Sequence, residues 1–406
     1  NIAVYEGGGM MKQPGTPDFD YYPCDHKINH VEYTSHALTL IWSDQRTSQY
    51  HACWLADNDA GSAVTNTLTR EREIDFVDMP GDIGIQQASV SDDGTLNIAW
   101  TADWPESRFL PGWLRAHDYS NDPMPDDGLR QATTWNINDL TEPPTTDGTE
   151  ILRDDDVLEA WLDNLAQYGL ARLANVAPDD GMVADVVRRI GPIRPTNFGF
   201  TYDVKTKANP DSNAYTDMAL DSHTDLATRE YQPGLQFLHC LKNSTTGGAG
   251  TMVDGFKVAE DIRVENPGVF EILSTWDWTF TNRARETDYR WVTPLIILDR
   301  DGQLSELRMT AFLRGPLAMP FDRTEKAYAA YHYLVEKIRE PQYRLRFDYR
   351  PGDLVAYDNR RILHGREAFS SGEGERWLQG CYSERDELRS RLRILARNRR
   401  AAKIGA

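Results

Sequence analysis

The sequence lacks any long apolar run, and cysteine and positive charge are both scarce. Nowhere in its 406 residues does a stretch approach the roughly 20 uncharged apolar residues that a membrane-spanning helix requires, so no membrane partner is expected. Residues 1–9 have neither a basic start nor an apolar core, and we expect no secretory signal there. The four cysteines, Cys24, Cys53, Cys240 and Cys381, form no CxxC pair. This scatter predicts a cytoplasmic protein without a disulfide framework.

Basic residues are outnumbered by acidic ones. The chain has 44 lysines and arginines against 63 aspartates and glutamates, for a formal net charge of -19. Such a charge repels polyanions, so a nucleic-acid partner is not expected, whereas it would help to gather a small cationic substrate. Hydrophobic residues make up 40% of the chain, and at this length they allow a catalytic domain with a sizeable core and a smaller second domain.

The first third of the chain is typical of β structure. Residues 36–42 (HALTLIW) and 96–100 (LNIAW) alternate or run apolar, and turn residues at 91–94 (SDDG) precede the second run. These segments predict a small β-rich domain over residues 1–120. Residues 121–150 are rich in Pro, Asp, Asn and Thr, and we predict that they form a linker.

The remaining residues, 151–406, mix helical and strand patterns. Apolar residues recur at helical spacing in residues 156–168, and further helices are expected at 182–190 and 320–340. The last of these carries an apolar face of Tyr328, Tyr331, Leu334, Val335 and Ile338. Strand-like runs occupy residues 169–173, 235–241, 291–298, 343–349 and 354–357. A few helices among many strands indicate an α+β fold that is mainly β.

Three residues that can hold a metal ion stand out. His223 and Asp225 lie two apart in the segment DSHTD, and alternate residues of a strand point to the same face. His364, in the segment RILHG, closely follows another strand-like run. Two imidazoles and one carboxylate form the facial triad of non-heme iron(II) oxygenases. A His-x-Asp pair also arises by chance, and a strand histidine bonded only to its neighbours is the plain alternative.

Arg376 adds a second feature. Residues 367–375 (EAFSSGEGE) are typical of a hairpin, so we predict that the strand beginning at Arg376 runs back alongside the strand of His364. A guanidinium there could grip a carboxylate through two parallel hydrogen bonds. Two histidines, an aspartate and an arginine in this order favour an oxygenase that uses iron and an oxo acid.

Several longer segments resemble the γ-butyrobetaine and trimethyllysine dioxygenase family, within the wider taurine-dioxygenase-like superfamily. They are DSHTD at residues 221–225, PGLQFLHC at 233–240, TGGAGTMVDGF at 246–256, PGDLVAYDNRRILHGREAF at 351–369 and SRLRIL at 390–395, with WLADN at 54–58 in the N-terminal domain. The resemblance implies that residues 151–406 form a double-stranded β-helix (jelly-roll) oxygenase domain. It also implies a homodimer.

The same resemblance implies roles for single residues. His223, Asp225 and His364 would hold Fe(II), and Arg376 would hold the distal carboxylate of the cosubstrate 2-oxoglutarate, with O2 as the second cosubstrate. Leu238 would line the cosubstrate pocket. Thr251 is a further cosubstrate candidate, one residue beyond the position where related enzymes often place a Thr or Ser.

Four aromatic residues match the positions of the family's trimethylammonium-binding cage: Phe198, Tyr202, Tyr215 and Tyr382. A quaternary ammonium group cannot donate hydrogen bonds, so aromatic faces are its natural partners through cation–π attraction. The match therefore implies a small cationic substrate. Each aromatic taken singly could instead belong to the core.

The sequence also departs from the family. Residues 59–65 (DAGSAVT) stand where the family has zinc-binding cysteines and contain no Cys or His, so zinc is not expected. The residues that hold the carboxylate of γ-butyrobetaine differ as well, since Leu226 replaces a Tyr and Ser212 an Asn. Arg308 and Arg314 lie close by in sequence and could serve a different acid group, or they could pair with surface acids.

Together these features predict an Fe(II)- and 2-oxoglutarate-dependent dioxygenase that hydroxylates an unactivated C–H bond of γ-butyrobetaine or a close trimethylammonium analogue. A 2-(trimethylammonio)ethylphosphonate hydroxylase is the alternative within the same chemistry. A catalytically silent binding protein on the same fold and a zinc hydrolase with the same ligands are alternatives from other classes. Iron-dependent succinate formation would separate the oxygenase from both.

Overall fold

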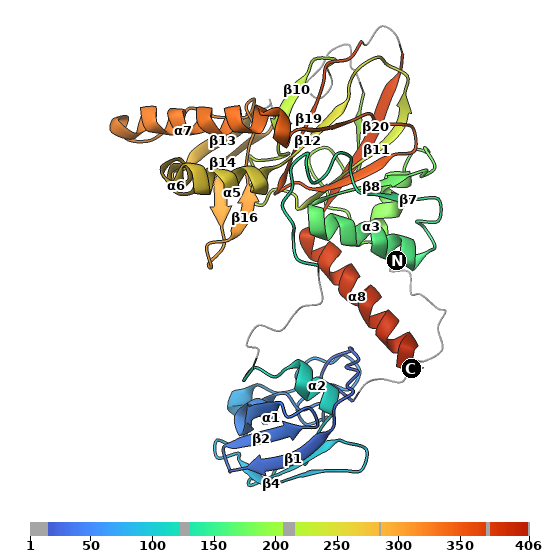
Figure 1. The fold of residues 1–406 in the computed structure, drawn as a ribbon, viewed down its shortest axis with the longest axis vertical. Coiled ribbons are helices and arrows are strands. Elements are labelled where there is room, and N and C mark those ends of the chain that lie inside the picture. The colour runs from blue at the N-terminus through green and yellow to red at the C-terminus, as the bar shows by residue number, and fades with distance from the viewer. Residues whose placement is uncertain (1–14, 122–129, 206–215, 284–285, 371–373, 405–406) are drawn as a thin grey trace. The chain divides into compact units, whose positions relative to one another are not determined.

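The computed structural model describes residues 15–121, 130–205, 216–283, 286–370 and 374–404 (Figure 1). The chain divides into two compact units, one formed by Asn1–Gly128 with Arg393–Ala406 and the other by Leu129–Leu392. The expected boundaries differ from these in two places, because residues 130–150 belong to the second unit and the last residues group with the first. No described helix is both long and apolar enough to cross a membrane.

The first unit is built from two three-stranded antiparallel sheets. One contains β1 (Ile28–Tyr33), β2 (Ala37–Trp42) and β3 (Thr47–His51), and the other β4 (Ile85–Val90), β5 (Leu96–Trp100) and β6 (Ser107–Phe109), with the short helices α1 (Ala52–Asp57) and α2 (Pro111–Ala116) and the 3-10 turn η1 (Phe76–Asp78). Alternate residues of β2, namely Leu38, Leu40 and Trp42, are fully buried in the core of this unit. The strands predicted at residues 36–42 and 96–100 are thereby confirmed.

The second unit contains two larger sheets that form a double-stranded β-helix (Figure 1). The six-stranded sheet has the order β7-β8-β18-β11-β20-β9, and the four-stranded sheet has the order β10-β19-β12-β17. Their strands are β7 (Thr145–Asp147), β8 (Leu170–Ala174), β9 (Tyr202–Val204), β10 (Leu220–His223), β11 (Leu235–Asn243), β12 (Gly250–Asp254), β17 (Leu345–Phe347), β18 (Leu354–Asp358), β19 (Ile362–Arg366) and β20 (Arg376–Ser383). The predicted class, α+β and mainly β with a jelly-roll, is confirmed.

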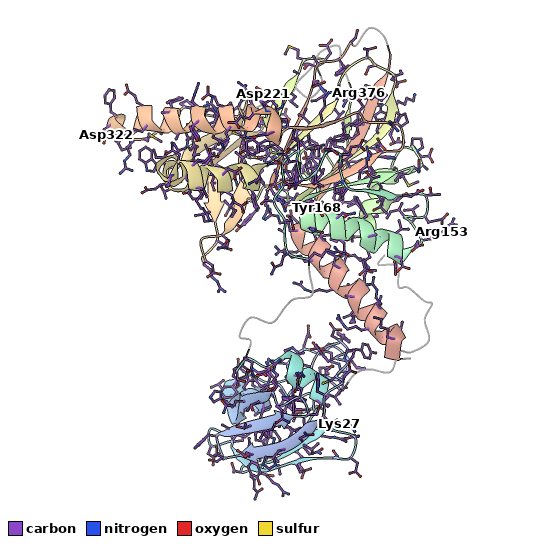
Figure 2. The ribbon with its side chains drawn as sticks, viewed as in Figure 1. Lys27, Arg153, Tyr168, Asp221, Asp322 and Arg376 are labelled. Carbon is purple, nitrogen blue, oxygen red and sulfur yellow. The ribbon has the colours of Figure 1, made fainter. Side chains whose placement is uncertain are left out.

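Side chains from both sheets meet in one core, and Figure 2 shows how densely they fill the unit. Met252 of β12, Tyr357 of β18 and Leu378 of β20 belong to this core cluster. All five residues of β12 are buried, because the sheet interior covers one face of the strand and helices cover the other. A strand covered on both faces is expected to be largely apolar rather than alternating, and in the segment GTMVD of β12 the exceptions are the buried Thr251 and Asp254.

Helices surround this core on two sides. They are α3 (Asp155–Tyr168), α4 (Met182–Arg188), α5 (Gly255–Glu265), α6 (Pro267–Thr275), α7 (Phe321–Arg339) and α8 (Arg385–Ile404), with the 3-10 turn η3 (Pro341–Tyr343) and the hairpins β13 (Trp278–Arg283)–β14 (Asp288–Thr293) and β15 (Ile296–Leu298)–β16 (Leu304–Leu307). Helices α5 and α6 were not predicted, and the expected strand at 291–298 is divided between β14 and β15. Its division falls at Pro294, which cannot donate a hydrogen bond to a sheet.

Part of the predicted linker is built into the second unit. Trp135 is 1% exposed, and β7 pairs in parallel with β8. A buried ion pair holds the segment near Trp135: Arg361 donates to Asp254 at 2.7 and 3.1 Å and to the carbonyl of Thr133 at 2.6 Å. Asp254 also accepts from the backbone N–H of Trp135 at 3.0 Å. The polar composition of this segment predicted a linker of which part could pack, and these long-range bonds satisfy the backbone of the packed part inside the fold.

His239 of β11 gives the fold a testable pH dependence. The side chain is fully buried, and this burial lowers the pKa of His239 from 6.5 to about 4, although the Val176 backbone and Asp179 act in the opposite direction. Between these two values the unfolded chain binds more protons than the folded chain. The contribution to stability is therefore complete above pH 6.5 and falls as the pH drops toward 4.

We expect His239→Leu to remove this dependence. Between pH 7 and pH 5 the free energy of unfolding should decrease in both proteins, and the decrease should be about 2 kcal/mol larger in the wild type than in the variant. Urea unfolding of both proteins at the two pH values, followed by circular dichroism, measures the difference. Equal losses in the two proteins would show that His239 does not stay neutral in the folded state.

Candidate active site

The two histidines predicted as metal ligands face each other on neighbouring strands. In the antiparallel pair of β10 and β19, His223 lies opposite His364, and their ring centroids are 4.2 Å apart. The sequence had suggested that His223 and Asp225 lie on one strand. Strand β10 instead ends at His223, and Asp225 lies in the following turn. The turn includes Leu226 in the left-handed region, at φ 55°. Ligating atoms of His223, Asp225 and His364 all lie within 4.8 Å of one another.

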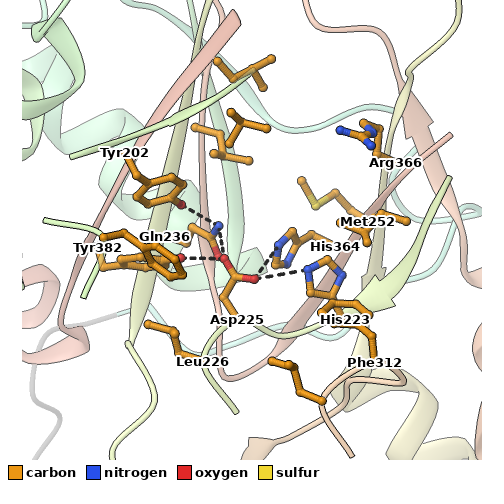
Figure 3. Close-up of a pocket in the computed structure, with 18 of the residues that line it drawn as sticks. Tyr202, His223, Asp225, Leu226, Gln236, Met252, Phe312, His364, Arg366 and Tyr382 are labelled. Atoms are coloured by element: carbon orange, nitrogen blue, oxygen red, sulfur yellow. Dashed lines mark hydrogen bonds and ion pairs between the residues drawn. The ribbon is translucent and has the colours of Figure 1, made fainter. Parts of the chain in front are cut away.

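The rings of His223 and His364 face the carboxylate of Asp225 (Figure 3), and a hydrogen bond fixes which nitrogen of His223 faces inward. Nδ1 of His223 lies 2.8 Å from the carbonyl of Asp221, to which only a protonated nitrogen can donate, so the lone pair is on Nε2. That Nε2 is 3.2 Å from Oδ1 of Asp225, and Nε2 of His364 is 3.6 Å from the same oxygen. Three lone-pair donors thus converge on one point, which is the arrangement that a divalent cation requires.

The charges of the site suit a cation. Burial opposes ionisation of Asp225, but the neighbouring His364 and His223 outweigh it and hold the pKa of this carboxyl well below its usual range. The site therefore presents a buried carboxylate in the ionised form that binds metal.

Asp225 is held by Gln236 and Asn359, which sequence reasoning missed, and by Tyr382, which it assigned only to the substrate. Its outer oxygen, Oδ2, accepts from Nε2 of Gln236 and from the hydroxyl of Tyr382, both at 2.7 Å. The side chain of Asn359 accepts from the backbone N–H of Asp225 at 2.8 Å and donates to its carbonyl at 3.0 Å. Gln236 could have been found from the period of two along β11, since it shares a face with the predicted pocket residue Leu238. No comparable pattern in the sequence indicated the hydrogen bonds between Asp225 and Asn359.

Arg376 is a buried cation without a counter-ion. Its side chain is 7% exposed, and among the described residues it forms no ion pair and its Nε has no hydrogen-bond partner. Burial lowers the pKa of this guanidinium. It lines the same cavity, of about 490 Å³, as His223, Asp225 and His364. A buried charge is costly unless it is paired, so this end of the cavity suits an anion.

The route by which Arg376 reaches the site differs from the prediction. Strand β20 does not pair with β19; it pairs with β11 and β9 in the six-stranded sheet, while β19 belongs to the four-stranded sheet. The chain therefore crosses from one sheet to the other after β19 instead of forming a hairpin. The expected hairpin also includes residues 371–373, which lie outside the described residues.

The structure describes most of the other predicted site residues, and most of those line the cavity. Leu238, Phe198, Tyr202 and Tyr382 line the cavity, whereas Tyr215 and Ser212 lie outside the described residues. Thr251 does not line it: Gly250 and Met252 face the cavity, and the alternation of β12 turns Thr251 to the other face, beside Gly365.

Neither of the two arginines expected near the substrate lines the cavity. Arg308 is 4% exposed and is taken up by an ion pair with Glu306 and by the carbonyl of Glu230 at 2.7 Å. Arg314 lies over the ring of Tyr331, 4.1 Å from its centroid. Both arginines are near site residues in sequence, but these contacts hold their side chains away from the cavity.

The segment without zinc ligands belongs to the first unit. Asp59 is 2% exposed and accepts from the hydroxyl of Ser107 at 2.8 Å and from the backbone of Gly61 at 3.0 Å. Burial raises the pKa of Asp59. A carboxylate engaged by local donors fits a structural role here, and the absence of a zinc site in this segment stays a prediction.

Comparison with known proteins agrees with this fold and site. The family model described as taurine catabolism dioxygenase TauD, TfdA family matches residues 136–382. A γ-butyrobetaine dioxygenase of Pseudomonas sp. (strain AK-1) is 39% identical over 94% of this chain and 99% of its own length. A γ-butyrobetaine dioxygenase of Homo sapiens is 31% identical, covering 89% of this chain and 95% of that protein. A mitochondrial trimethyllysine dioxygenase of Gallus gallus is 30% identical, covering 88% and 86%.

A jelly-roll whose cavity joins two histidines, an aspartate and a buried arginine defines a dioxygenase dependent on iron(II) and 2-oxoglutarate. The chain belongs to the taurine catabolism dioxygenase (TauD, TfdA) family. The resemblance stated from the sequence motifs is thereby confirmed. The residues present fit both cofactors, since the converging lone pairs suit a divalent ion and the uncompensated Arg376 suits a carboxylate.

The charge of Arg376 leads to a prediction about 2-oxoglutarate. We expect Arg376→Leu to weaken its binding well over tenfold, because a carboxylate placed in this pocket without its partner costs about 2–5 kcal/mol. Calorimetric titration with 2-oxoglutarate in the presence of Mn(II) measures the affinity. Arg346→Leu, which removes an exposed guanidinium of β17 that pairs with Glu367 at 3.0 Å, is the control and should leave it unchanged. Equal affinities in wild type and Arg376→Leu would assign the grip to another residue.

Proposed function

We propose that this dioxygenase hydroxylates an unactivated C–H bond of a small trimethylammonium compound, with γ-butyrobetaine as the first candidate. The observation that carries the proposal is an aromatic wall beside the metal-binding cluster. Phe198, Tyr202 and Tyr382 line the cavity that also contains His223, Asp225 and His364. The names of the most similar relatives, which include γ-butyrobetaine dioxygenases, support the same substrate class.

In this proposal His223, Asp225 and His364 hold iron(II), Arg376 holds the distal carboxylate of 2-oxoglutarate, and Leu238 packs beside the cosubstrate. Iron and 2-oxoglutarate supply the chemistry: O2 gives one oxygen atom to the C–H bond and the other to succinate, with release of CO2. The protein binds and orients the reactants and keeps water from the buried site. Because the protein would supply only three ligands, the ion would keep room for cosubstrate and oxygen.

The aromatic wall suits an onium group. The rings of Phe198 and Tyr202 are 6.2 Å apart and inclined at 54°, and Tyr202 stacks on Tyr382 at 5.2 Å. A trimethylammonium group placed against these rings gains cation–π attraction and loses no hydrogen bonds to water. A primary ammonium would lose such bonds, which aromatic faces cannot replace. The wall therefore selects for the quaternary group.

Besides Arg366 and Arg376, which line the cavity themselves, an arginine that was not expected from the sequence bonds to a polar residue of its lining. Asn197 and Asn282 line the cavity, and Arg229 donates to Oδ1 of Asn197 at 2.6 Å. This bond turns the amide N–H groups of Asn197 toward other acceptors. Arg229 lies over the ring of Tyr289, and no described carboxylate pairs with it. We propose that the acid group of the substrate lies on this side, near Asn197 and Arg229.

A phosphonate remains the second candidate for that acid group, and the observation that favours it is the unpaired charge of Arg229. The arginines that first suggested a phosphonate, Arg308 and Arg314, do not reach the cavity. A carboxylate is therefore the first choice, with carnitine formation from γ-butyrobetaine as the reaction. A substrate panel containing 2-(trimethylammonio)ethylphosphonate separates the two.

We also propose that the enzyme acts in the cytoplasm as a homodimer. All four cysteines are free thiols, which suits a reducing compartment. Light scattering of the purified protein measures the oligomeric state directly, and a monomeric mass at micromolar concentration would exclude the dimer.

The role of the metal ligands can be tested without turnover. We expect Asp225→Ala to lose the weak visible charge-transfer band that iron(II) and 2-oxoglutarate give together under anaerobic conditions, because two remaining ligands hold the ion loosely. The wild type should show the band. Glu336→Ala, which removes an exposed carboxylate of α7 that does not line the cavity, controls for general loss of charge. An unchanged band in Asp225→Ala would refute the assignment.

Substrate preference can be measured by succinate release. The wild type should turn over γ-butyrobetaine in preference to the primary amine of the same length. Tyr202→Leu should raise KM for the onium compound by a factor corresponding to about 1–2 kcal/mol. Tyr328→Leu, a half-exposed tyrosine of α7, should have no effect. If no onium compound stimulates succinate release while a non-cationic acid does, the aromatic wall is core and the proposal fails.

A further inference from the structure

Tyr382 connects the aromatic wall to the metal ligand Asp225. Its ring is part of the wall, and its hydroxyl donates a hydrogen bond to Asp225. We propose that the hydroxyl of Tyr382, together with Gln236, is a positioning device for Asp225: it holds the outer carboxylate oxygen so that the inner oxygen alone faces the metal. The ring of the same residue serves the substrate. The inference rests on the proposed metal site, but it does not depend on which onium compound is the substrate.

The two oxygens of Asp225 have different partners. Oδ1 faces the Nε2 atoms of His223 and His364, at 3.2 and 3.6 Å. Oδ2 receives two hydrogen bonds of 2.7 Å, from Gln236 and from Tyr382. With both lone pairs of Oδ2 engaged, the carboxylate cannot rotate to present that oxygen without breaking both bonds. The arrangement therefore favours a single ligating oxygen and leaves room at the metal for other ligands.

The fold places these donors together through strand register. Gln236 of β11 and Tyr382 of β20 are directly paired in the six-stranded sheet, so both side chains lie on its inner face. Tyr202 of β9 is paired with Gly380 of β20, where a Cβ would lie 2.6 Å from the Tyr202 ring. The absence of a side chain at Gly380 allows Tyr202 to approach and accept from Nε2 of Gln236 at 2.9 Å. Figure 3 shows this chain of bonds ending at Asp225.

Burial makes these bonds matter. Tyr382 is 3% exposed and Gln236 is 2% exposed, so neither bond is readily exchanged for water. The 2.7 Å separation between the hydroxyl of Tyr382 and Oδ2 of Asp225 is that of a charge-assisted hydrogen bond in which the phenol donates to the carboxylate. Residues that orient a metal ligand in this way typically change metal affinity by 10–100-fold when they are removed.

Tyr349 provides a matched control for Tyr382. It lines the same cavity and is 5% exposed, but its hydroxyl has no hydrogen-bond partner among the residues that the structure describes. Removing that hydroxyl therefore removes equal bulk and polarity without touching Asp225. The comparison of Tyr382→Phe with Tyr349→Phe isolates the bond to the carboxylate from the general effect of a lost phenol.

The experiment measures Mn(II) affinity by calorimetry, without 2-oxoglutarate or substrate. Tyr382→Phe should bind Mn(II) about tenfold or more weakly than the wild type, and Tyr349→Phe should stay within about twofold. Gln236→Leu, which removes the other bond to Oδ2, should resemble Tyr382→Phe and covers the case in which one variant folds poorly. Unchanged Mn(II) affinity in a folded Tyr382→Phe or Gln236→Leu variant would overturn the inference.

A second readout separates the hydroxyl from the ring. At saturating iron, Tyr382→Phe should leave KM for γ-butyrobetaine within about twofold, because the aromatic face remains, whereas Tyr382→Leu should raise it in addition to weakening Mn(II). Equal KM increases in the two variants would show that the hydroxyl serves the substrate and not the metal, against the inference. A Tyr382 effect on Mn(II) in a protein that turns over no onium compound would leave this inference standing and overturn the proposed function instead.

Discussion

The position of β19 between β10 and β12 is the constraint on which the site depends. His364 of β19 lies opposite His223 on one side and opposite Met252 on the other, so its side chain faces the cavity. A slip of one residue in either pairing would turn His364 away, because side chains alternate between the faces of a strand. The buried pair of Arg361 and Asp254 ties the residue before β19 to the last residue of β12, where the register begins.

Two buried arginines of the second unit are paired with carboxylates, whereas the arginine at the site is not paired within the described residues. Arg361 is paired with Asp254 and Arg308 with Glu306, whereas Arg376 has no described counter-ion. A buried charge without a counter-ion lowers the stability of the folded state, and a ligand that supplies the opposite charge raises it. A divalent cation beside Asp225 and a dicarboxylate beside Arg376 would each supply the missing charge. The same groups whose burial is costly therefore give the pocket affinity for both cofactors.

Local patterns predicted much of the fold. The helical period of α3, the alternation of β2 and the apolar run of β11 depend on contacts that each segment makes with one side of a core, and such contacts leave a period in the sequence. Residues 130–150 and strand β20 were misplaced for the opposite reason. Trp135 is buried by bonds to Asp254, and β20 pairs with β11 instead of β19. Both depend on partners far away along the chain, so no short segment records them.

The sequence by itself determined which chemistry this protein performs, because iron ligation and the grip on a carboxylate are properties of residue types that motifs such as DSHTD and RILHG carry. Only the tertiary structure decided how the parts are used. It selected Arg376 as the buried arginine without a counter-ion while Arg308 is consumed by Glu306, and it turned Thr251 out of the cavity. It also joined Tyr382 and Gln236 to one oxygen of Asp225. The physical reason is that hydrogen bonds and ion pairs form between residues that are far apart in the sequence. Only the pairing of strands within the sheets brings such residues together.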